Sequence, residues 1–192
     1  MGKVLMGPQT WIYPMPVLLV GADVDGKPNF MAVAWASIAN GEPPMISVVI
    51  RHSRYTLKGI RQNMTFSVNI PSEDMVGEAD YCGLKSGAKV DKAEACGFRV
   101  FYGKVEGAPL IEQCPLNLEC KAMYMLNLGS DTLIVGRIEE THVSESCLTD
   151  GKPDVSKMKP LIYTISPSSH YRAFGEVIAP AFSVGKQLYQ GK

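Results

Sequence analysis

The chain has 192 residues, 46% of them hydrophobic and 20% charged, and its 19 basic residues balance 19 acidic ones. Such a composition is ordinary for a globular protein, so we expect residues 1–192 to form a single domain. The neutral balance argues against nucleic-acid binding, which needs a basic face. No apolar run approaches the roughly 20 residues of a membrane span, and prolines interrupt the N-terminal segment where a signal peptide would be apolar. We therefore expect a cytoplasmic protein with no membrane partner.

The strand pattern dominates the chain. Apolar runs and period-two alternation predict strands at residues 17–22, 29–38, 45–50, 66–70, 116–126, 133–143 and 161–165. Asp25-Gly26 is a hairpin signal between the first two strands, and residues 128–132 turn the chain between the two long strands. The pattern is that of an antiparallel sheet.

Helical signals are few. One predicted helix covers Thr56–Asn63 and another covers residues 72–81, where Ser72 would be the N-cap. Residues 144–159 are polar and contain Gly151 and Pro153, so we interpret them as a loop, and residues 166–192 show weak periodicity. Many short strands without alternating helices predict a mainly β fold, a closed or partly closed antiparallel barrel with a few short helices.

The five cysteines, at positions 82, 96, 114, 120 and 147, are odd in number and contain no Cys-x-x-Cys pair. This pattern fits neither a disulfide framework nor a zinc site, and the three histidines complete no metal-ligand set. We expect structural thiols and no metal site. Cys82 is the exception that could lie near a cofactor, because it lies just before the glycine-containing stretch that begins at Ser86.

A candidate anion site lies in the stretch Arg51-His52-Ser53-Arg54-Tyr55-Thr56, between a predicted strand and a predicted helix. A guanidinium, hydroxyl groups and a helix N-terminus are the donors that hold a phosphate. The alternative readings are a solvated arginine at a strand end and a threonine that only caps the helix. The two roles of Thr56 are compatible, because the first-turn amides remain available to an anion.

A second stretch, Ser86-Gly87-Ala88-Lys89-Val90-Asp91-Lys92, is a loop whose glycine allows close approach to a ligand. It is also a common composition for an ordinary turn. Neither Gly-x-Gly-x-x-Gly nor a Walker-type phosphate loop is present. A phosphorylated ligand would therefore be held by the two stretches together.

Several small residues in the run 29–38 leave room for a flat ligand against the backbone. Trp35 in this run has the alternative role of a core tryptophan. The runs at 29–37, 51–56, 66–71 and 82–87, with Asp91-Lys92 after them, together resemble the flavoredoxin branch of the flavin reductase-like proteins. The resemblance covers roughly residues 14–186.

The resemblance implies an antiparallel Greek-key split barrel, a homodimer, and one non-covalently bound FMN per subunit near the dimer interface. It also implies which residues contact that cofactor. By similarity, residues 32–37 lie along the flavin ring, residues of the 51–56 stretch serve the phosphate and ribityl chain, and residues of the 86–92 stretch close the other side. The cofactor-binding residues so implied are Asn29, Met31, Ala32, Trp35, Ala36, Ser37, Arg51, Ser53, Tyr55, Thr56, Ser86, Gly87, Lys92 and Tyr171.

Three functions remain open from the sequence. The first is an enzyme, an NAD(P)H-dependent reductase that passes electrons through FMN to flavin, ferric iron or a protein acceptor. The second is an FMN-binding electron carrier served by a redox protein, without NAD(P)H activity. The third is a split barrel that binds no flavin, which the two intact stretches disfavour. No residue is identified as a catalytic acid or base, and hydride transfer to flavin does not require one.

Overall fold

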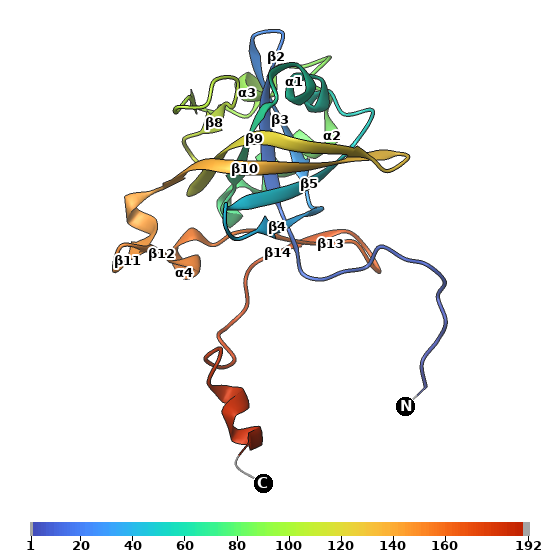
Figure 1. Ribbon diagram of the computed structural model, residues 1–192, viewed down its shortest axis with the longest axis vertical. Helices are drawn as coiled ribbons and strands as arrows, with labels where there is room; N and C mark the ends of the chain where they lie inside the picture. Colours follow the sequence, from blue (N-terminus) through green and yellow to red (C-terminus); the bar gives the residue numbers. More distant parts are fainter. Residues whose placement is uncertain (1, 190–192) are drawn as a thin grey trace.

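The computed structural model describes residues 2–189, and its main element is one antiparallel sheet of seven strands in the order β3-β2-β6-β9-β10-β5-β4. The sheet is strongly coiled, and β9 and β10 run across the direction of β2 and β3 (Figure 1). The strands are β1 (Met15–Pro16), β2 (Leu18–Val24), β3 (Lys27–Val33), β4 (Ala36–Asn40), β5 (Met45–Arg51), β6 (Thr65–Ile70), β7 (Val100–Phe101), β8 (Leu110–Ile111), β9 (Leu116–Asn127), β10 (Asp131–Val143), β11 (Leu148–Thr149), β12 (Lys152–Pro153), β13 (Ile162–Thr164) and β14 (His170–Arg172).

The helices are short and lie outside this sheet. They are α1 (Thr56–Asn63), α2 (Val76–Leu84), α3 (Lys92–Ala95) and α4 (Val155–Met158), with 3-10 segments at Glu73–Met75, Glu145–Cys147 and Val184–Tyr189. None of the described helices is both long and apolar enough to cross a membrane. The mainly β, antiparallel fold with few helices is the one expected from the sequence.

The chain nearly closes the sheet at one point, residues 34–35. β3 and β4 are the two opposite edges of the seven-stranded sheet, yet they follow each other directly in the chain. The amide of Ala36 donates to the carbonyl of Ala34, and the carbonyl of Trp35 accepts from the amide of Val49, so the chain turns sharply and joins β5. The predicted single strand 29–38 is therefore wrong: it is two edge strands joined by a corner.

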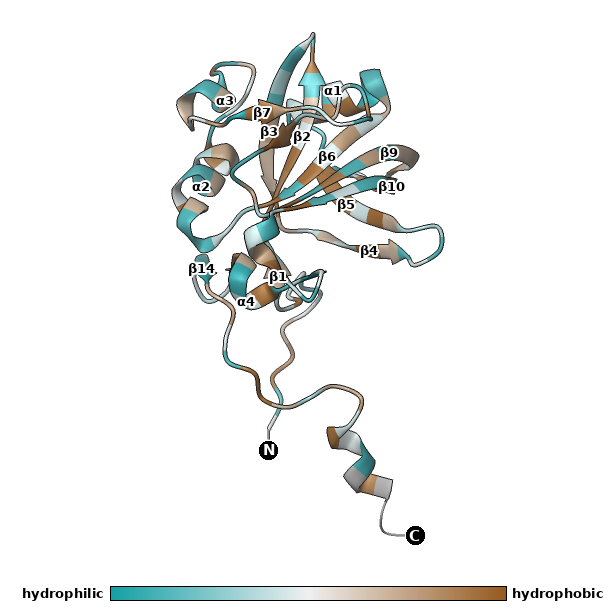
Figure 2. Ribbon diagram, turned by 90° about the vertical axis from the view of Figure 1, so that its left-hand side faces the viewer, coloured by the Kyte–Doolittle hydropathy of each residue, from teal (hydrophilic) through white to brown (hydrophobic). Residues whose placement is uncertain are grey.

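Two apolar clusters fill the molecule. The first lies inside the coiled sheet and includes Val20, Val48, Ile50, Phe66 and Ile134, all of them fully buried. The second lies between the other face of β2 and β3 and the layer of α2 and α3, which cover one side of the sheet in Figure 2. Each strand of the β2–β3 hairpin thus has both faces covered, which explains its continuous apolar character.

Other sequence expectations are corrected at the element ends. The helix Thr56–Asn63 is confirmed, but its N-cap is Tyr55, without a side-chain hydrogen bond. The helix predicted at 72–81 begins as a 3-10 turn and continues as α2 to Leu84, and Ser72 makes no side-chain cap. The predicted loop 144–159 contains the short strands β11 and β12 and the helix α4. Asp154 caps α4 by accepting from the amide of Ser156. The tail contributes β14, which pairs with β13.

A buried polar network joins the sheet to β8. The amide group of Asn69 donates to the carbonyl of Leu19 at 2.9 Å and to Ser67 Oγ at 2.9 Å. Its oxygen accepts from the amide of Ile111 at 3.0 Å and from Asn117 Nδ2 at 2.8 Å. Asn69 has no exposed surface, so these partners are its only means of satisfying its polar atoms.

We expect Asn69→Ala to lower the free energy of unfolding by about 2–5 kcal/mol, because several buried groups lose their partner at once. Asn127→Ala is the matched control: its Oδ1 accepts from the amide of Gly129 at the exposed hairpin tip, and a change within about 1 kcal/mol is expected. Urea unfolding followed by circular dichroism measures both. Equal losses in the two variants would contradict the role given to the network.

Candidate functional site

Five of the residues singled out from the sequence meet in one groove. Asn29 Nδ2 of β3 donates to the hydroxyl of Thr56 at the start of α1, at 2.6 Å. A Cβ built on Gly87 would lie 1.8 Å from Asn29 Oδ1 and 3.1 Å from Tyr55 Cδ1, so only a glycine allows this approach. Asn29, Tyr55, Gly87 and Lys92 line a cavity of about 400 Å³ together with Lys89 and Asp91. The two stretches predicted to cooperate are thus in contact.

Lys92 is the buried cation of this groove. Its side chain is almost fully enclosed, and Nζ donates to the carbonyl of Phe30 at 2.8 Å and to that of Cys82 at 2.9 Å. β3 is an edge strand, and Lys92 supplies a donor to one of its backbone carbonyls. Burial lowers the pKa of Lys92, and the positive charge of Arg54 acts in the same direction. An ammonium has three N–H groups, so one is left for a further acceptor.

Arg54 lines a second cavity, beside the tail of the chain. Its guanidinium donates to the carbonyl of Gly83 at the end of α2, at 3.1 Å. Gly83, Ala32 and Tyr171 line this second cavity with Arg54, and its volume is about 380 Å³. The Tyr171 hydroxyl donates to Asp80 Oδ1 at 2.9 Å, and burial, followed by this bond, raises the pKa of Tyr171. The resemblance implied that Tyr171 contacts the cofactor, and nothing in the sequence indicated that Arg54 and Asp80 are its neighbours.

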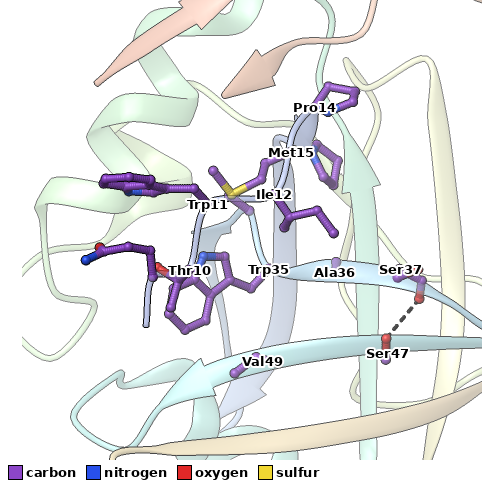
Figure 3. A pocket seen from close by; sticks show the side chains of 13 residues that line it. Thr10, Trp11, Ile12, Pro14, Met15, Trp35, Ala36, Ser37, Ser47 and Val49 are labelled. Atoms are coloured by element: carbon purple, nitrogen blue, oxygen red, sulfur yellow. Dashed lines mark hydrogen bonds between the residues drawn. The ribbon is translucent and has the colours of Figure 1, made fainter. Parts of the chain in front are cut away.

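Trp35, Ala36 and Ser37 line a different cavity, on the other side of the corner at residues 34–35. This cavity lies between the N-terminal segment 9–16 and the strands β4 and β5 (Figure 3). Trp35 is 37% exposed, so the alternative reading of a core tryptophan is wrong. Ala34 lines both this cavity and the one beside Tyr171, which makes them adjacent.

Four predicted site residues lie apart from these contacts. Arg51 is exposed at the end of β5, and its Nε is 3.9 Å from Asp131 Oδ1. Ser53 lies in the turn before α1, in a surface hollow that also includes Arg54 and Tyr55. Ser86 forms a tight turn whose carbonyl accepts from the amides of residues 89 and 90. The Met31 side chain is buried inside the sheet, which leaves only its backbone for a ligand.

The N-terminal segment is the part of the site that the sequence analysis missed. Trp11 and Ile12 face the corner from a segment without regular structure, and their sequence carries no motif. A buried face of a strand or helix can be recognised from the periodic spacing of its apolar residues. An extended segment such as this one has no such period, so the sequence did not reveal the contact.

The cysteines behave as structural thiols. All five are free, and Cys82, Cys114, Cys120 and Cys147 are buried. Burial raises the pKa of Cys82 to about 12, so this thiol stays protonated near neutral pH. Cys82 does lie beside the groove, because its carbonyl accepts from Lys92. Among residues 2–189, no group of three His, Cys, Asp or Glu side chains gathers to hold a metal ion.

The lowered pKa of Lys92 predicts a stability effect at alkaline pH. The folded-state pKa lies below the ordinary value of 10.5, so between the two values the unfolded chain binds more protons than the folded one. Stability contributed by this site therefore rises with pH in that window. The unfolding free energy of the wild type minus that of Lys92→Met should increase with pH between the lowered folded-state pKa and 10.5.

Urea unfolding at a series of pH values measures this difference. Lys89→Met, at an exposed lysine of the same loop, is the control and should show no such rise. If the difference in unfolding free energy between the wild type and Lys92→Met stays constant or falls with pH, the lowered pKa of the buried Lys92 ammonium is contradicted.

The chain was compared with known families and structures. A family model described as the flavin reductase like domain matches residues 10–168. A flavoredoxin from Methanosarcina acetivorans is 44% identical, with a TM-score of 0.93 over 98% of this chain and 100% of its own. The flavoredoxin of Desulfovibrio vulgaris (Miyazaki F) is 39% identical, with a TM-score of 0.89 over 96% and 100% of the two chains. An uncharacterised protein of Archaeoglobus fulgidus is 33% identical over 76% of this chain and 81% of its own length.

More distant likenesses agree on the fold. A putative flavin reductase with a split barrel domain from Shewanella frigidimarina NCIMB 400 is 19% identical with a TM-score of 0.76, over 88% of this chain and 86% of its own. The sheet with its corner at residues 34–35 is therefore a split barrel, as expected from the sequence. Because the family model spans most of the chain and the flavoredoxin matches cover nearly all of it, the chain belongs to the flavin reductase-like family.

Proposed function

We propose that the chain binds FMN in the groove between Gly87 and Tyr171 and works as a flavin-dependent oxidoreductase. The observation that carries the proposal is the convergence of Asn29, Tyr55, Gly87 and Lys92 on one cavity, with a buried ammonium that keeps a free donor. The solved flavoredoxins are relatives over nearly the whole chain, and a protein of Thermus thermophilus that is 25% identical is named as FMN-binding.

The residues present fit a phosphorylated, flat ligand. Arg54, Lys89 and Lys92 supply positive charge along the groove, and Gly87 leaves the space that a Cβ would fill. Ala32, Ala34 and Gly83 provide a surface of small side chains next to the edge of β3. A planar ring against such a surface can reach backbone donors and acceptors that a larger side chain would cover.

We assign the phosphate end to the turn before α1. Arg51 is exposed and its contact with Asp131 is long, so little free energy opposes its turning toward an anion. Ser53 and the buried hydroxyl of Thr56 add donors. The amides of Leu57 and Lys58 already donate to Arg54 and Tyr55, so the side chains carry more of the binding than the helix terminus does.

We assign the ring to the corner of the barrel, along Ala32–Ser37, with Tyr171 and Lys92 beside it. When bound, FMN supplies the transfer of hydride or single electrons, and the protein supplies its position and electrostatics. Lys92 offers positive charge to the polar edge of the ring, which favours a negative charge developing there. Asp80 fixes the Tyr171 hydroxyl, so this side chain is held in one orientation.

Within this family the proposed activity is an NAD(P)H-dependent reductase that delivers electrons to flavin, ferric iron or a protein acceptor. A flavin reductase of Pseudomonas putida is 26% identical over 68% of this chain. The second candidate, favoured by the flavoredoxin relatives, is an FMN-binding electron carrier that receives electrons from a redox protein. Both use the same site and differ only in the electron donor.

We also propose that the protein is a homodimer in the cytoplasm. Both ends of the chain extend away from the barrel as arms (Figures 1 and 2). These arms carry large apolar side chains that are more than half exposed in a single subunit, namely Val4, Leu5, Ile12, Phe174, Val177, Ile178 and Phe182. A second copy is the surface that would cover them at the lowest cost.

An absorption spectrum of the purified protein, loaded with FMN and made anaerobic, tests the proposed function. We expect flavin absorption bands that remain with the protein after gel filtration. Rapid bleaching by NADH or NADPH supports the reductase, whereas bleaching only by dithionite or a reduced redox protein supports the carrier. A protein that stays colourless with added FMN would refute both.

A further inference from the structure

Two cysteines stand at the two ends of the loop that lines the groove. Cys82 lies in the last turn of α2, Cys96 is the C-cap of α3, and the stretch 86–92 runs between them. Both helices pack on β3, on the same side of the sheet (Figure 2). We call residues 83–95 the groove loop. A covalent bond between the two cysteines would close the groove loop at its base.

The packing of α2 and α3 makes these two thiols neighbours. Cys82 is fully buried in the apolar cluster beneath α2 and α3, and Cys96 packs against the same cluster. Lys92 is hydrogen-bonded to both residues: its Nζ donates to the carbonyl of Cys82 at 2.9 Å, and the amide of Cys96 donates to the Lys92 carbonyl at 3.1 Å. Burial raises the pKa of both thiols, and the contact between them then lowers the pKa of Cys96 and raises that of Cys82 further.

The difference in exposure between the two thiols decides which one an oxidant can reach. Cys96 is only partly buried, whereas Cys82 has no exposed surface. The third thiol of the cluster, Cys114, is also enclosed, and its Sγ lies 3.9 Å from Met75 Sδ. A small oxidant in solution therefore reaches Cys96 first, and Cys82 reacts only with a group already placed beside it.

We propose that Cys82 and Cys96 are a redox pair, which hydrogen peroxide oxidises to a disulfide that fixes the groove loop. The Cys96 thiolate attacks one peroxide oxygen, the O–O bond breaks, and Cys96 becomes a sulfenic acid as hydroxide leaves. The Cys82 sulfur then displaces the sulfenic hydroxyl group, which leaves with the thiol proton as water. Two thiols and one peroxide thus give one disulfide and two waters, and a dithiol reductant reverses the reaction.

The disulfide acts on the groove through the loop that it closes. Gly87 and Lys92, which line the groove, both belong to the groove loop. A cross-link at the base of a loop removes much of the freedom that the open loop would gain. The oxidised protein therefore opens the groove less often and releases a bound ligand more slowly. For FMN as that ligand, this consequence rests on the proposed function.

Peptide mapping of the full chain tests the disulfide itself. The protein is treated with hydrogen peroxide, its remaining thiols are blocked with iodoacetamide, and it is digested with trypsin without reduction. Cleavage after lysine and arginine places Cys82 on peptide 62–85, Cys96 on peptide 93–99, and Cys114 on peptide 105–121. We expect the first two peptides to be joined, at a mass two hydrogens below their sum, and to separate after dithiothreitol.

Variants with a small apolar side chain guard against misfolding. Cys96→Ala and Cys82→Ala should each lose the joined peptides, with circular dichroism showing that both fold. Cys147→Ala, at a buried thiol outside this cluster, is the matched control and should keep them. Oxidation of Cys96 to the sulfinic acid with Cys82 left free, or a link between peptides 62–85 and 105–121, would overturn the proposal.

Limited digestion of the native protein tests the fixing of the groove loop. Lys85 and Lys89 are exposed in this loop, and Lys104 is an exposed site outside it. The disulfide should slow cleavage after Lys85 and Lys89 by about tenfold, because cleavage follows the opening of the loop. Cleavage after Lys104 should not change, and peroxide should have no effect on the loop of Cys96→Ala. Equal cleavage of the loop in the oxidised and reduced wild type would overturn its fixing by the disulfide.

The release of FMN separates this inference from the proposed function. Slower release from the oxidised than from the reduced wild type, with no difference in Cys96→Ala, supports the link between the redox pair and the groove. Equal release from the two forms would overturn that link. A protein that forms the disulfide and fails to bind FMN would refute the proposed function and leave the redox pair and its loop intact.

Discussion

The site depends on one backbone constraint, the corner at Ala34–Trp35. Here the chain leaves one edge of a seven-stranded sheet and begins the opposite edge, so the barrel is almost closed by the chain itself but not by hydrogen bonds between β3 and β4. A fully closed barrel would have no free strand edges. This one keeps an opening, and the two candidate binding spaces lie on either side of it.

The exposed edge of a strand can pair with a strand of another chain. At the edge strand β3, the buried ammonium of Lys92 occupies a backbone acceptor. Lys92 donates to the backbone carbonyl of Phe30 on β3 and is itself held by the carbonyl of Cys82. The burial of an ammonium against neutral acceptors alone is unfavourable. An anionic ligand would compensate it, so the same residue protects the edge and favours a negatively charged cofactor. Stability and binding are coupled at this position.

Most of the strands and the helix Thr56–Asn63 were predictable, because each follows from local periodicity. The meeting of the two polar stretches was predictable only from the ligand chemistry that they share, because they are distant in the sequence. The corner was not, since Ala34 and Trp35 are compatible with a continuous strand and only the pairing of β4 with β5 breaks it. The role of Trp11 was also out of reach, because an arm without regular structure has no periodic signal.

The roles of individual site residues were predictable only in part. The resemblance implied that Gly87 and Lys92 contact the ligand, and the structure brings both to one groove, where Gly87 lies close to Asn29 and Lys92 is a buried ammonium. Strand alternation turns the Met31 side chain to the interior of the barrel, so only the backbone of Met31 is available for the predicted contact. Arg54 was not predicted as a site residue, because its hydrogen-bond partner Gly83 belongs to α2, which is distant in the sequence.

The most direct test of the account compares the affinities of FMN and riboflavin, which differ by the phosphate, for the wild type and for Arg51→Ala. If the turn before α1 holds the phosphate, the wild type binds FMN more tightly than riboflavin, and Arg51→Ala weakens FMN by about 1.5–3 kcal/mol while leaving riboflavin unchanged. Arg99→Ala, at an arginine paired with Glu112, is the control and should change neither affinity. Equal affinity of the wild type for the two flavins would contradict a phosphate site at this turn.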